Sequence, residues 1–359
     1  MSSNMSYDWK MTLFFVLTNN FKLYPEAYEC SKDWTSPGAQ WPKFGIYLMV
    51  SGLIFLSLYL PCFIAILKIK SSAPTYQLMS LIAVFDITSL INGSLINGYI
   101  TYQGIFFCQY PLFFFITGSL ALFSWLSNCI VCIFLAIERV SEVDSDFALS
   151  FLFGKKVFRI LKWCIMFYSI SSLLLGKSIV FSAAYGSYLY DPLIGKDPNL
   201  YKNNWVAGNN FIMAISTTTL YFYLCYYLLF KYRYSTSMWL YKSKRQIILQ
   251  GIFLCFFHSA TALIYEYLYF LSSPIELIIA GHVMWQISCG SLSIVYLTLN
   301  RTIRNSVLKM VIPKRMRAKF GWHIGVEEHQ AVESAMDASG FKGVAIVGAV
   351  VKIDNYFPS

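Results

Sequence analysis

Seven long apolar stretches limit what this chain can fold into. Each covers at least 20 residues with few charges inside it, and at 1.5 Å per residue such a helix crosses about 30 Å of hydrocarbon. Only 13% of the 359 residues are charged, whereas about 25% is usual for a soluble protein. We therefore expect an all-α membrane protein, a seven-transmembrane helix bundle with lipid as its solvent. The expected spans are 44–67, 76–99, 112–137, 157–184, 210–230, 246–271 and 275–299.

Prolines and basic residues divide the chain around these spans. Pro74, Pro111 and Pro274 stand between spans, where a proline ends a helix because it lacks an amide donor. After the last span, Ile303 and Val307 recur at helical spacing among basic residues, which is typical of a short amphipathic helix on the inner leaflet. The expected parts are an extracellular N-terminal segment (1–43), the bundle (44–299), the basic surface helix (300–319) and a flexible cytoplasmic tail (320–359).

The distribution of Lys and Arg predicts the orientation in the membrane. One side of the expected bundle carries eighteen of these residues in its connections and the other carries six, and the more basic side normally faces the cytoplasm. With an odd number of spans, the N-terminus then lies outside and the C-terminus inside. A glycosylation sequon at Asn4 agrees with this orientation, although such short motifs also arise by chance. The predicted location is the plasma membrane.

Charge and motif spacing argue against other classes of protein. The net charge of +10 gathers at the ends of the spans, so we expect membrane lipids rather than nucleic acid to face these basic residues. The only close pair of cysteines, Cys129 and Cys132, lies inside an apolar span, where a zinc site is hard to form. Gly176-Lys177-Ser178 looks like the end of a phosphate-binding loop but lacks the first glycine. We expect no enzyme activity, no metal site and no cofactor.

Three motifs within the spans point to a receptor. The third span ends in Glu138-Arg139, the second carries Asp86 after Ile82-Ala83, and the seventh closes with a run from Tyr296 through Asn300 to Arg304. These stretches are similar to those of rhodopsin-like G-protein-coupled receptors. In that family the acid holds the arginine at rest and releases it to meet a heterotrimeric G protein. The resemblance implies a signalling role for Glu138, Arg139, Tyr296, Asn300 and Arg304, and the alternative for Arg139 is an anchor in the lipid headgroups.

Asp86 lies about 15 Å inside the membrane, ten residues from the start of its span. A charged carboxylate at that depth is costly unless it is paired, hydrated or protonated. Asn128 on the third span and Ser288 and Ser291 on the seventh stand at a comparable depth, so we expect the four to form an interior polar cluster. In similar receptors such a cluster is hydrated or holds a sodium ion. The alternative is a neutral Asp86 that only joins helices.

Further motifs follow in order along residues 28 to 310. They are Tyr28-Glu29-Cys30 with Trp34, Gly45-x-Tyr47 with Gly52, Leu60-Pro61-Cys62, Cys108-x-x-Pro111, Glu138-Arg139 and the run from Tyr296 to Arg304. Together they resemble the nematode serpentine chemoreceptors of class T, a divergent branch. Leu292-Ser293 replaces the Asn-Pro expected before the tyrosine, and the sixth span lacks Cys-Trp-x-Pro. The resemblance implies a chemosensory receptor for a small molecule in which the usual activation switches are partly missing.

The resemblance also implies a disulfide at the outer face. Rhodopsin-like receptors tie the top of the third helix to the second outer loop, but residues 185–209 contain no cysteine. We expect Cys108 to pair instead with Cys30, which the oxidising exterior allows. The alternative is two free thiols.

The ligand pocket is expected between the outer halves of the helices, where apolar and aromatic walls surround a few polar groups. His258 and His282 lie inside their spans, and Trp205 stands in a long connection that suits a lid. Each histidine has an alternative role as an interhelical hydrogen-bonding residue. Glu266 is expected near the outer surface, and Lys177 is expected to extend toward the membrane interface.

A transporter or channel is the main alternative to a receptor, because seven apolar spans do not by themselves signal. Transporters usually show paired halves, broken helices and several charges within the membrane. Here the number of spans is odd and Asp86 is the only deep acid, which favours the receptor.

Overall fold

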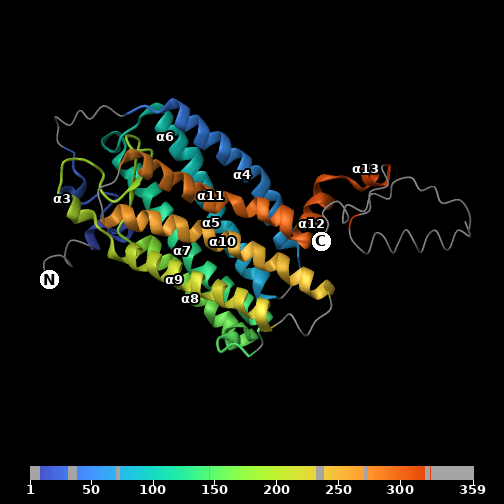
Figure 1. Cartoon of the computed structure of the whole chain (residues 1–359). Coiled ribbons are helices and arrows are strands. Elements are labelled where there is room, and N and C mark those ends of the chain that lie inside the picture. Colours follow the sequence, from blue (N-terminus) through green and yellow to red (C-terminus); the bar gives the residue numbers. More distant parts are fainter. Residues whose placement is uncertain are drawn as a thin grey trace, which may run out of the picture.

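The structure, a computed structural model, describes residues 9–30, 39–69, 73–144, 146–231, 238–270, 274–319 and 324. Within these residues, seven long helical segments run side by side along one bundle (Figure 1). The expected seven-helix fold is confirmed. In chain order the segments are α4 (Pro42–Lys68), α5 (Pro74–Leu90) continued by the π-helical η2 (Ile91–Ile96) and by α6 (Asn97–Gln103), α7 (Pro111–Val143), α8 (Lys155–Leu175), α9 (Asn204–Tyr226) continued by the π-helical η6 (Tyr227–Lys231), α10 (Met238–Phe270) and α11 (Ile275–Leu299).

Six of these segments are long and apolar enough to cross a membrane, judged over the described residues alone. The one that falls short is α9, which has the length, 23 residues, but carries many polar side chains. Several of these side chains point into the bundle. Tyr168 donates a hydrogen bond to Asn209 Oδ1 at 2.9 Å, and Trp125 Nε1 donates one to Asn210 Oδ1 at 2.8 Å. Because such bonds satisfy its polar groups within the protein, α9 can lie in lipid beside the other six.

The fourth expected span, 157–184, is wrong at its outer end. Helix α8 stops at Leu175, and the chain then forms a hairpin of β1 (Val180–Ser182) and β2 (Ser187–Leu189). The apolar run in the sequence extends beyond α8 because Val180 and Phe181, on β1, are buried inside the protein. Lys177 follows α8, and its Nζ donates to the Leu200 and Lys202 carbonyls at 2.9 and 3.0 Å.

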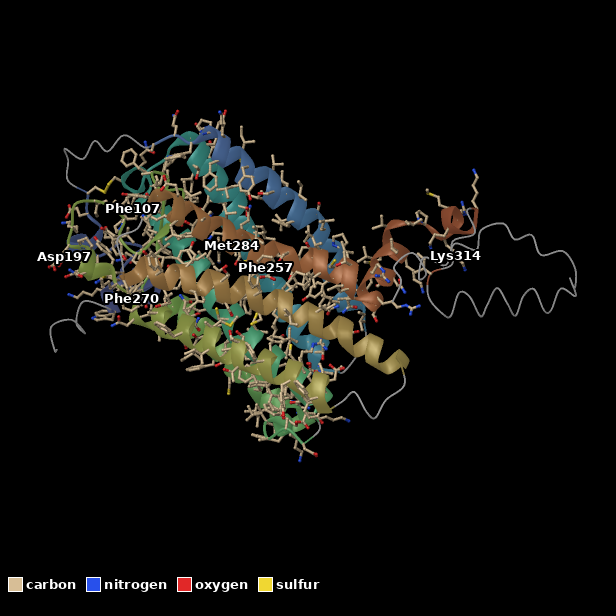
Figure 2. The ribbon with its side chains drawn as sticks, in the orientation of Figure 1. Phe107, Asp197, Phe257, Phe270, Met284 and Lys314 are labelled. Atoms are coloured by element: carbon tan, nitrogen blue, oxygen red, sulfur yellow. A yellow bond between two sulfur atoms is a disulfide. The ribbon has the colours of Figure 1, made fainter. Side chains whose placement is uncertain are left out.

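Short N-terminal elements gather at the same end of the bundle as this hairpin (Figure 1). They are η1 (Trp9–Met11), α2 (Leu13–Thr18) and α3 (Pro25–Tyr28). The expected disulfide between Cys30 and Cys108 is confirmed, and the yellow bond near Phe107 marks it in Figure 2. The Tyr28 ring packs edge-on against Phe115 at 5.3 Å. The N-terminal segment is therefore fastened to the bundle both covalently and by aromatic packing.

The opposite end of the bundle carries α12 (Arg301–Val311) and α13 (Lys314–Lys319). Asn300 begins α12, because its Oδ1 accepts a hydrogen bond from the Ile303 amide at 3.0 Å. Ile303 and Val307 are buried while Arg301 is exposed, which is the amphipathic pattern expected. Near this end, α7 extends six residues past its expected limit, to Val143. The remaining short elements are η3 (Phe107–Gln109), η4 (Ser150–Phe153) and η5 (Pro198–Tyr201).

Two expectations fall outside the described residues. They are the sequon at Asn4 and the flexible tail (320–359), of which only residue 324 is described.

Candidate functional site

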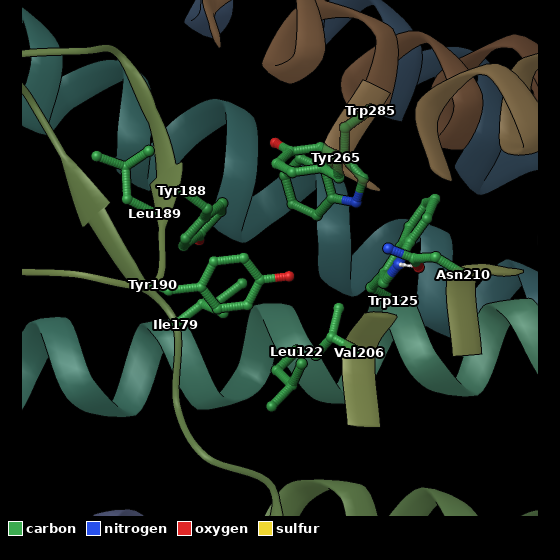
Figure 3. A pocket seen from close by; sticks show the side chains of 10 residues that line it. All are labelled: Leu122, Trp125, Ile179, Tyr188, Leu189, Tyr190, Val206, Asn210, Tyr265 and Trp285. Carbon is green, nitrogen blue, oxygen red and sulfur yellow. Dashed lines mark hydrogen bonds between the residues drawn. The ribbon is translucent and has the colours of Figure 1, made fainter. Parts of the chain in front are cut away.

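A small cavity lies inside the bundle beneath the β-hairpin (Figure 3). It offers about 40 Å³ to the centre of a water-sized sphere, which is room for roughly three waters. Most of its wall is apolar or aromatic. The lining residues are Leu122, Trp125, Ile179, Tyr188, Leu189, Tyr190, Val206, Asn210, Tyr265 and Trp285.

The hairpin forms the roof of this cavity because Gly118 on α7 allows the chain before β1 to pack closely against the helix. A Cβ at Gly118 would overlap the carbonyl oxygen of Ile179, so only a glycine fits there. Next to it, Ser178 Oγ donates a hydrogen bond to the Phe115 carbonyl at 2.9 Å. These contacts hold Tyr188 and Tyr190 over the cavity, and the Tyr190 hydroxyl points into the space between the lining side chains (Figure 3).

Asn210 supplies an amide to the cavity wall. Its Oδ1 accepts a hydrogen bond from Trp125 Nε1, and its amide is also close enough to hydrogen-bond the carboxylate of Glu266 on α10. Asn210 therefore connects the cavity wall to this acid.

The three residues expected in the pocket do not line this cavity. His258 lies directly beneath it, stacked on the lining Trp125 with ring centroids 6.1 Å apart. His282 lies behind Tyr188, and its Nε2 is 3.0 Å from the Gly93 carbonyl. Trp205 lies at the N-terminal end of α9, where it packs on Tyr168 and lines a separate surface hollow with Trp9 and Lys177.

Below the cavity, Asp86 is fully buried and accepts two hydrogen bonds. Asn128 Nδ2 donates to Asp86 Oδ1 at 2.6 Å, and Tyr59 donates to Asp86 Oδ2 at 2.6 Å. Asn128 Nδ2 also lies 3.2 Å from His258 Nε2. His258 Nδ1 is 3.0 Å from the Leu254 carbonyl; a proton on Nδ1 leaves Nε2 free to accept from Asn128. The structure thus joins Asp86 and Asn128 and adds Tyr59 and His258 to them.

The two serines expected in this cluster are turned elsewhere. Ser288 Oγ donates to the Trp285 carbonyl of its own helix at 2.8 Å, and Ser291 is only half-buried. Hard cations need several oxygen ligands, but here both Asp86 oxygens are engaged by donors and Ser288 bonds its own backbone. The arrangement in this conformation does not fit a sodium ion.

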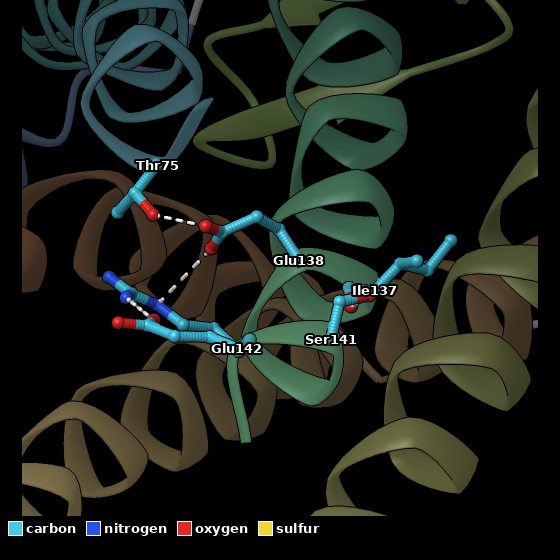
Figure 4. Close-up of polar contacts among 6 residues, drawn as sticks. Thr75, Ile137, Glu138, Ser141 and Glu142 are labelled. Atoms are coloured by element: carbon cyan, nitrogen blue, oxygen red, sulfur yellow. Dashed lines mark hydrogen bonds and ion pairs between the residues drawn. The ribbon is translucent and has the colours of Figure 1, made fainter. Parts of the chain in front are cut away.

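Near the C-terminal end of α7, Glu138 and Arg139 are both buried. Their closest approach is 4.0 Å, between Arg139 Nε and Glu138 Oε2, while Arg139 NH1 lies 2.8 Å from Glu142 Oε2. Thr75 on α5 donates a hydrogen bond to Glu138 Oε1. Figure 4 shows Thr75 and Glu142 on either side of this group. The arginine is therefore held on its own helix, and α5 is joined to α7 through the acid.

A second small cavity adjoins Arg139. Tyr221 on α9, Gln250 on α10 and Tyr296 on α11 line it, and the hydroxyls of both tyrosines are buried without a hydrogen-bond partner among the described residues. Further along, Arg304 NH1 donates to the Thr298 carbonyl at 2.9 Å. Tyr296 thus faces the arginine region, while Asn300 and Arg304 shape the junction of α11 and α12.

Several residues of the site could not be recognised in the sequence. Tyr59 and Trp125 are aromatic residues in apolar helices, and no spacing distinguishes them from lipid-facing ones. A weak signal existed for the roof, because Tyr188 and Tyr190 alternate with Leu189 as in a half-buried strand.

The fold and the site define the class of the protein: a multi-pass helical membrane protein with a small, mostly aromatic cavity near one end and a buried acid–arginine pair near the other. The sequence model of the family described as serpentine type 7TM GPCR chemoreceptor Srt matches residues 11–320. Serpentine receptor class T-55 from Caenorhabditis elegans is 25% identical over 292 residues, which cover 79% of this chain and 80% of that protein. The chain belongs to the Srt family of serpentine chemoreceptors.

Proposed function

We propose that this chemoreceptor detects a small molecule in the cavity beneath the hairpin and signals to a heterotrimeric G protein through the region around Arg139. Its N-terminus faces the outside of the plasma membrane, and its basic connections and α12 face the cytoplasm and the inner-leaflet lipids. Family membership favours a receptor over a transporter or channel.

One continuous set of contacts supports this proposal. Trp125 in the cavity wall stacks on His258, which contacts Asn128, which in turn bonds Asp86. On the far side of Asp86, the Tyr59 ring packs edge-on against Tyr296 at 6.2 Å. Tyr296 lines the small cavity beside Arg139. Packed and hydrogen-bonded groups of this kind can carry coupling between two sites, provided that they have two arrangements.

The groups around Arg139 have contacts available for a second arrangement. Tyr221 and Tyr296 have hydroxyls without partners in the described part of the chain, and Arg139 is held only by acids of its own helix. When a ligand moves Trp125 and the residues below it, Tyr296 shifts, Arg139 leaves Glu142 and the inner ends of α9 and α10 separate from α7. A ligand shifts the equilibrium toward this state by the difference between its binding free energies for the two states.

The proposal is tested by expressing the receptor in a heterologous cell and screening a panel of small-molecule cues with a G-protein activation readout. Arg139→Ala is expected to abolish the response to an active cue while surface expression is retained. Arg159→Ala is the matched control, because Arg159 is an exposed arginine near the inner end of α8, and it is expected to respond normally.

Cue-driven activation that persists in Arg139→Ala would contradict the signalling role of this residue. Flux of a cue across sealed vesicles without any G-protein activation would favour a transporter instead.

A further inference from the structure

The outer half of α10 contains a buried acid that the mechanism above does not use. Glu266 is only 5% exposed; the neutral Asn210 amide is close enough to hydrogen-bond its carboxylate, but no lysine or arginine among the described residues forms an ion pair with it. Removing a carboxylate from water without a partner is costly, and the cost falls when a cation lies nearby. Glu266 is therefore a candidate partner for a positive charge that the chain itself does not supply.

This acid lies beside the cavity. Tyr265, the preceding residue, lines the cavity, and so do Asn210 and Tyr190. The Asn210 amide is close enough to Glu266 to hydrogen-bond its carboxylate, and the Tyr190 hydroxyl is close enough to interact with it electrostatically. Glu266 thus interacts with two side chains of the wall, so its carboxylate lies near whatever occupies the cavity.

The wall itself is suited to a cation. Half of the ten lining residues are aromatic, and no lysine or arginine is among them. A cation over the face of a tryptophan or tyrosine is stabilised by about 2 kcal/mol or more when water is excluded. The five rings belong to Trp125, Tyr188, Tyr190, Tyr265 and Trp285.

We propose that the ligand is a small alkylammonium ion, held by this aromatic cage and neutralised by Glu266. The inference depends on the proposed function, since it names the chemistry of the cue that the same cavity detects. Because the cavity offers only about 40 Å³ to the centre of a water-sized sphere, we infer an ammonium group with a short alkyl part. A neutral alcohol of the same shape fills the space but gains nothing from the carboxylate.

The test measures binding to the full-length receptor in lipid nanodiscs without a G protein. Two probes of nearly equal shape are compared by calorimetry, isopropylammonium chloride and isopropanol. The unaltered receptor is expected to bind isopropylammonium at least about tenfold more tightly than isopropanol. Glu266→Gln is expected to reduce that preference to less than about threefold.

Glu276→Gln is the matched control, because Glu276 is an exposed glutamate in the first turn of α11, the helix after α10. It is expected to leave the preference unchanged. If Glu266→Gln does not fold, Tyr190→Leu removes one ring of the cage and is expected to weaken isopropylammonium binding at least about threefold.

Equal or tighter binding of isopropanol, or no saturable binding of isopropylammonium by the unaltered receptor, overturns the inference. So does an undiminished ammonium preference in a folded Glu266→Gln protein. Because no G protein is present, these results leave the proposed signalling function standing. Conversely, ammonium binding combined with signalling that ignores Arg139 would overturn the signalling proposal alone.

Discussion

The two ends of the bundle are closed by different kinds of contact. At the hairpin end, a disulfide, a β-hairpin seated against Gly118 and packed aromatic rings hold the chain in one arrangement. At the α12 end, Arg139 is held by two acids on its own helix, and two tyrosine hydroxyls beside it have no partner in the described residues. The first end suits recognition of a ligand of defined shape. The second suits a switch, because little has to be broken before another arrangement forms.

The largest expected effect is at the closed end. Replacing both Cys30 and Cys108 with serine opens a loop of 78 residues, and loops of this length are stabilised by about 4 kcal/mol when a disulfide closes them. We expect the double variant to lose most of its surface expression and to melt at a clearly lower temperature. Cys164→Ser, which alters an exposed free cysteine on α8, is the control and is expected to behave as the unaltered protein does. Unchanged thermal stability of the double variant would show that packing alone closes this end.

The next effect concerns the roof of the cavity. Gly118→Ala places a methyl group against the Ile179 carbonyl, and overpacking of this kind costs about 1–3 kcal/mol. We expect the hairpin to shift and the response to cues to be lost or strongly weakened, as measured by dose–response in cells. Gly208→Ala is the matched control, since a Cβ at Gly208 meets nothing within 4 Å, and its effect is expected to stay near zero. A full response from Gly118→Ala would mean that the hairpin does not shape the cavity.

The smallest of these three effects is expected at the α12 end, where the two acids that hold Arg139 can be compared. Glu142 lies nearer to Arg139 than Glu138 does, but its side chain is 44% exposed, against 9% for Glu138. Exposed ion pairs contribute only about 0–1 kcal/mol, while a buried charged hydrogen bond contributes about 1.5–3 kcal/mol. We expect Glu138→Gln to raise signalling without a cue by roughly tenfold and Glu142→Gln by much less. A larger rise in Glu142→Gln than in Glu138→Gln would show that the distance to Arg139 matters more than the burial of the acid.

The number and order of the helices could largely be predicted from the sequence. The number of spans, the amphipathic α12 and the pairing of Cys30 with Cys108 follow from apolar length, helical spacing and a family resemblance. The extent of α8 does not, because hydropathy cannot tell a buried strand such as β1 from the end of a span. Likewise, α9 is recognised as a long apolar stretch although its asparagines and threonines lower its hydropathy.

Within the site, the height of a residue along its helix could be predicted, but the direction in which its side chain points could not. Counting residues along helices placed Asp86 and Asn128 at one level, and the structure joins them. Ser288 stands at the same level but is turned to its own backbone, because height along a helix does not determine which neighbour a side chain meets. For the same reason His258 and His282 do not line the cavity beneath the hairpin, since each has a partner below or behind its wall.

The central claim is that occupation of the outer cavity changes the arrangement of the inner ends. The most direct measurement is the distance between spin labels introduced at Ser141 on α7 and Ile252 on α10, with and without an activating cue, in the unaltered receptor and in Asp86→Asn. The account predicts that the cue lengthens this distance in the unaltered receptor and changes it much less in the variant. A cue that activates the G protein while the distance stays the same, or that lengthens it equally in both proteins, would contradict the account.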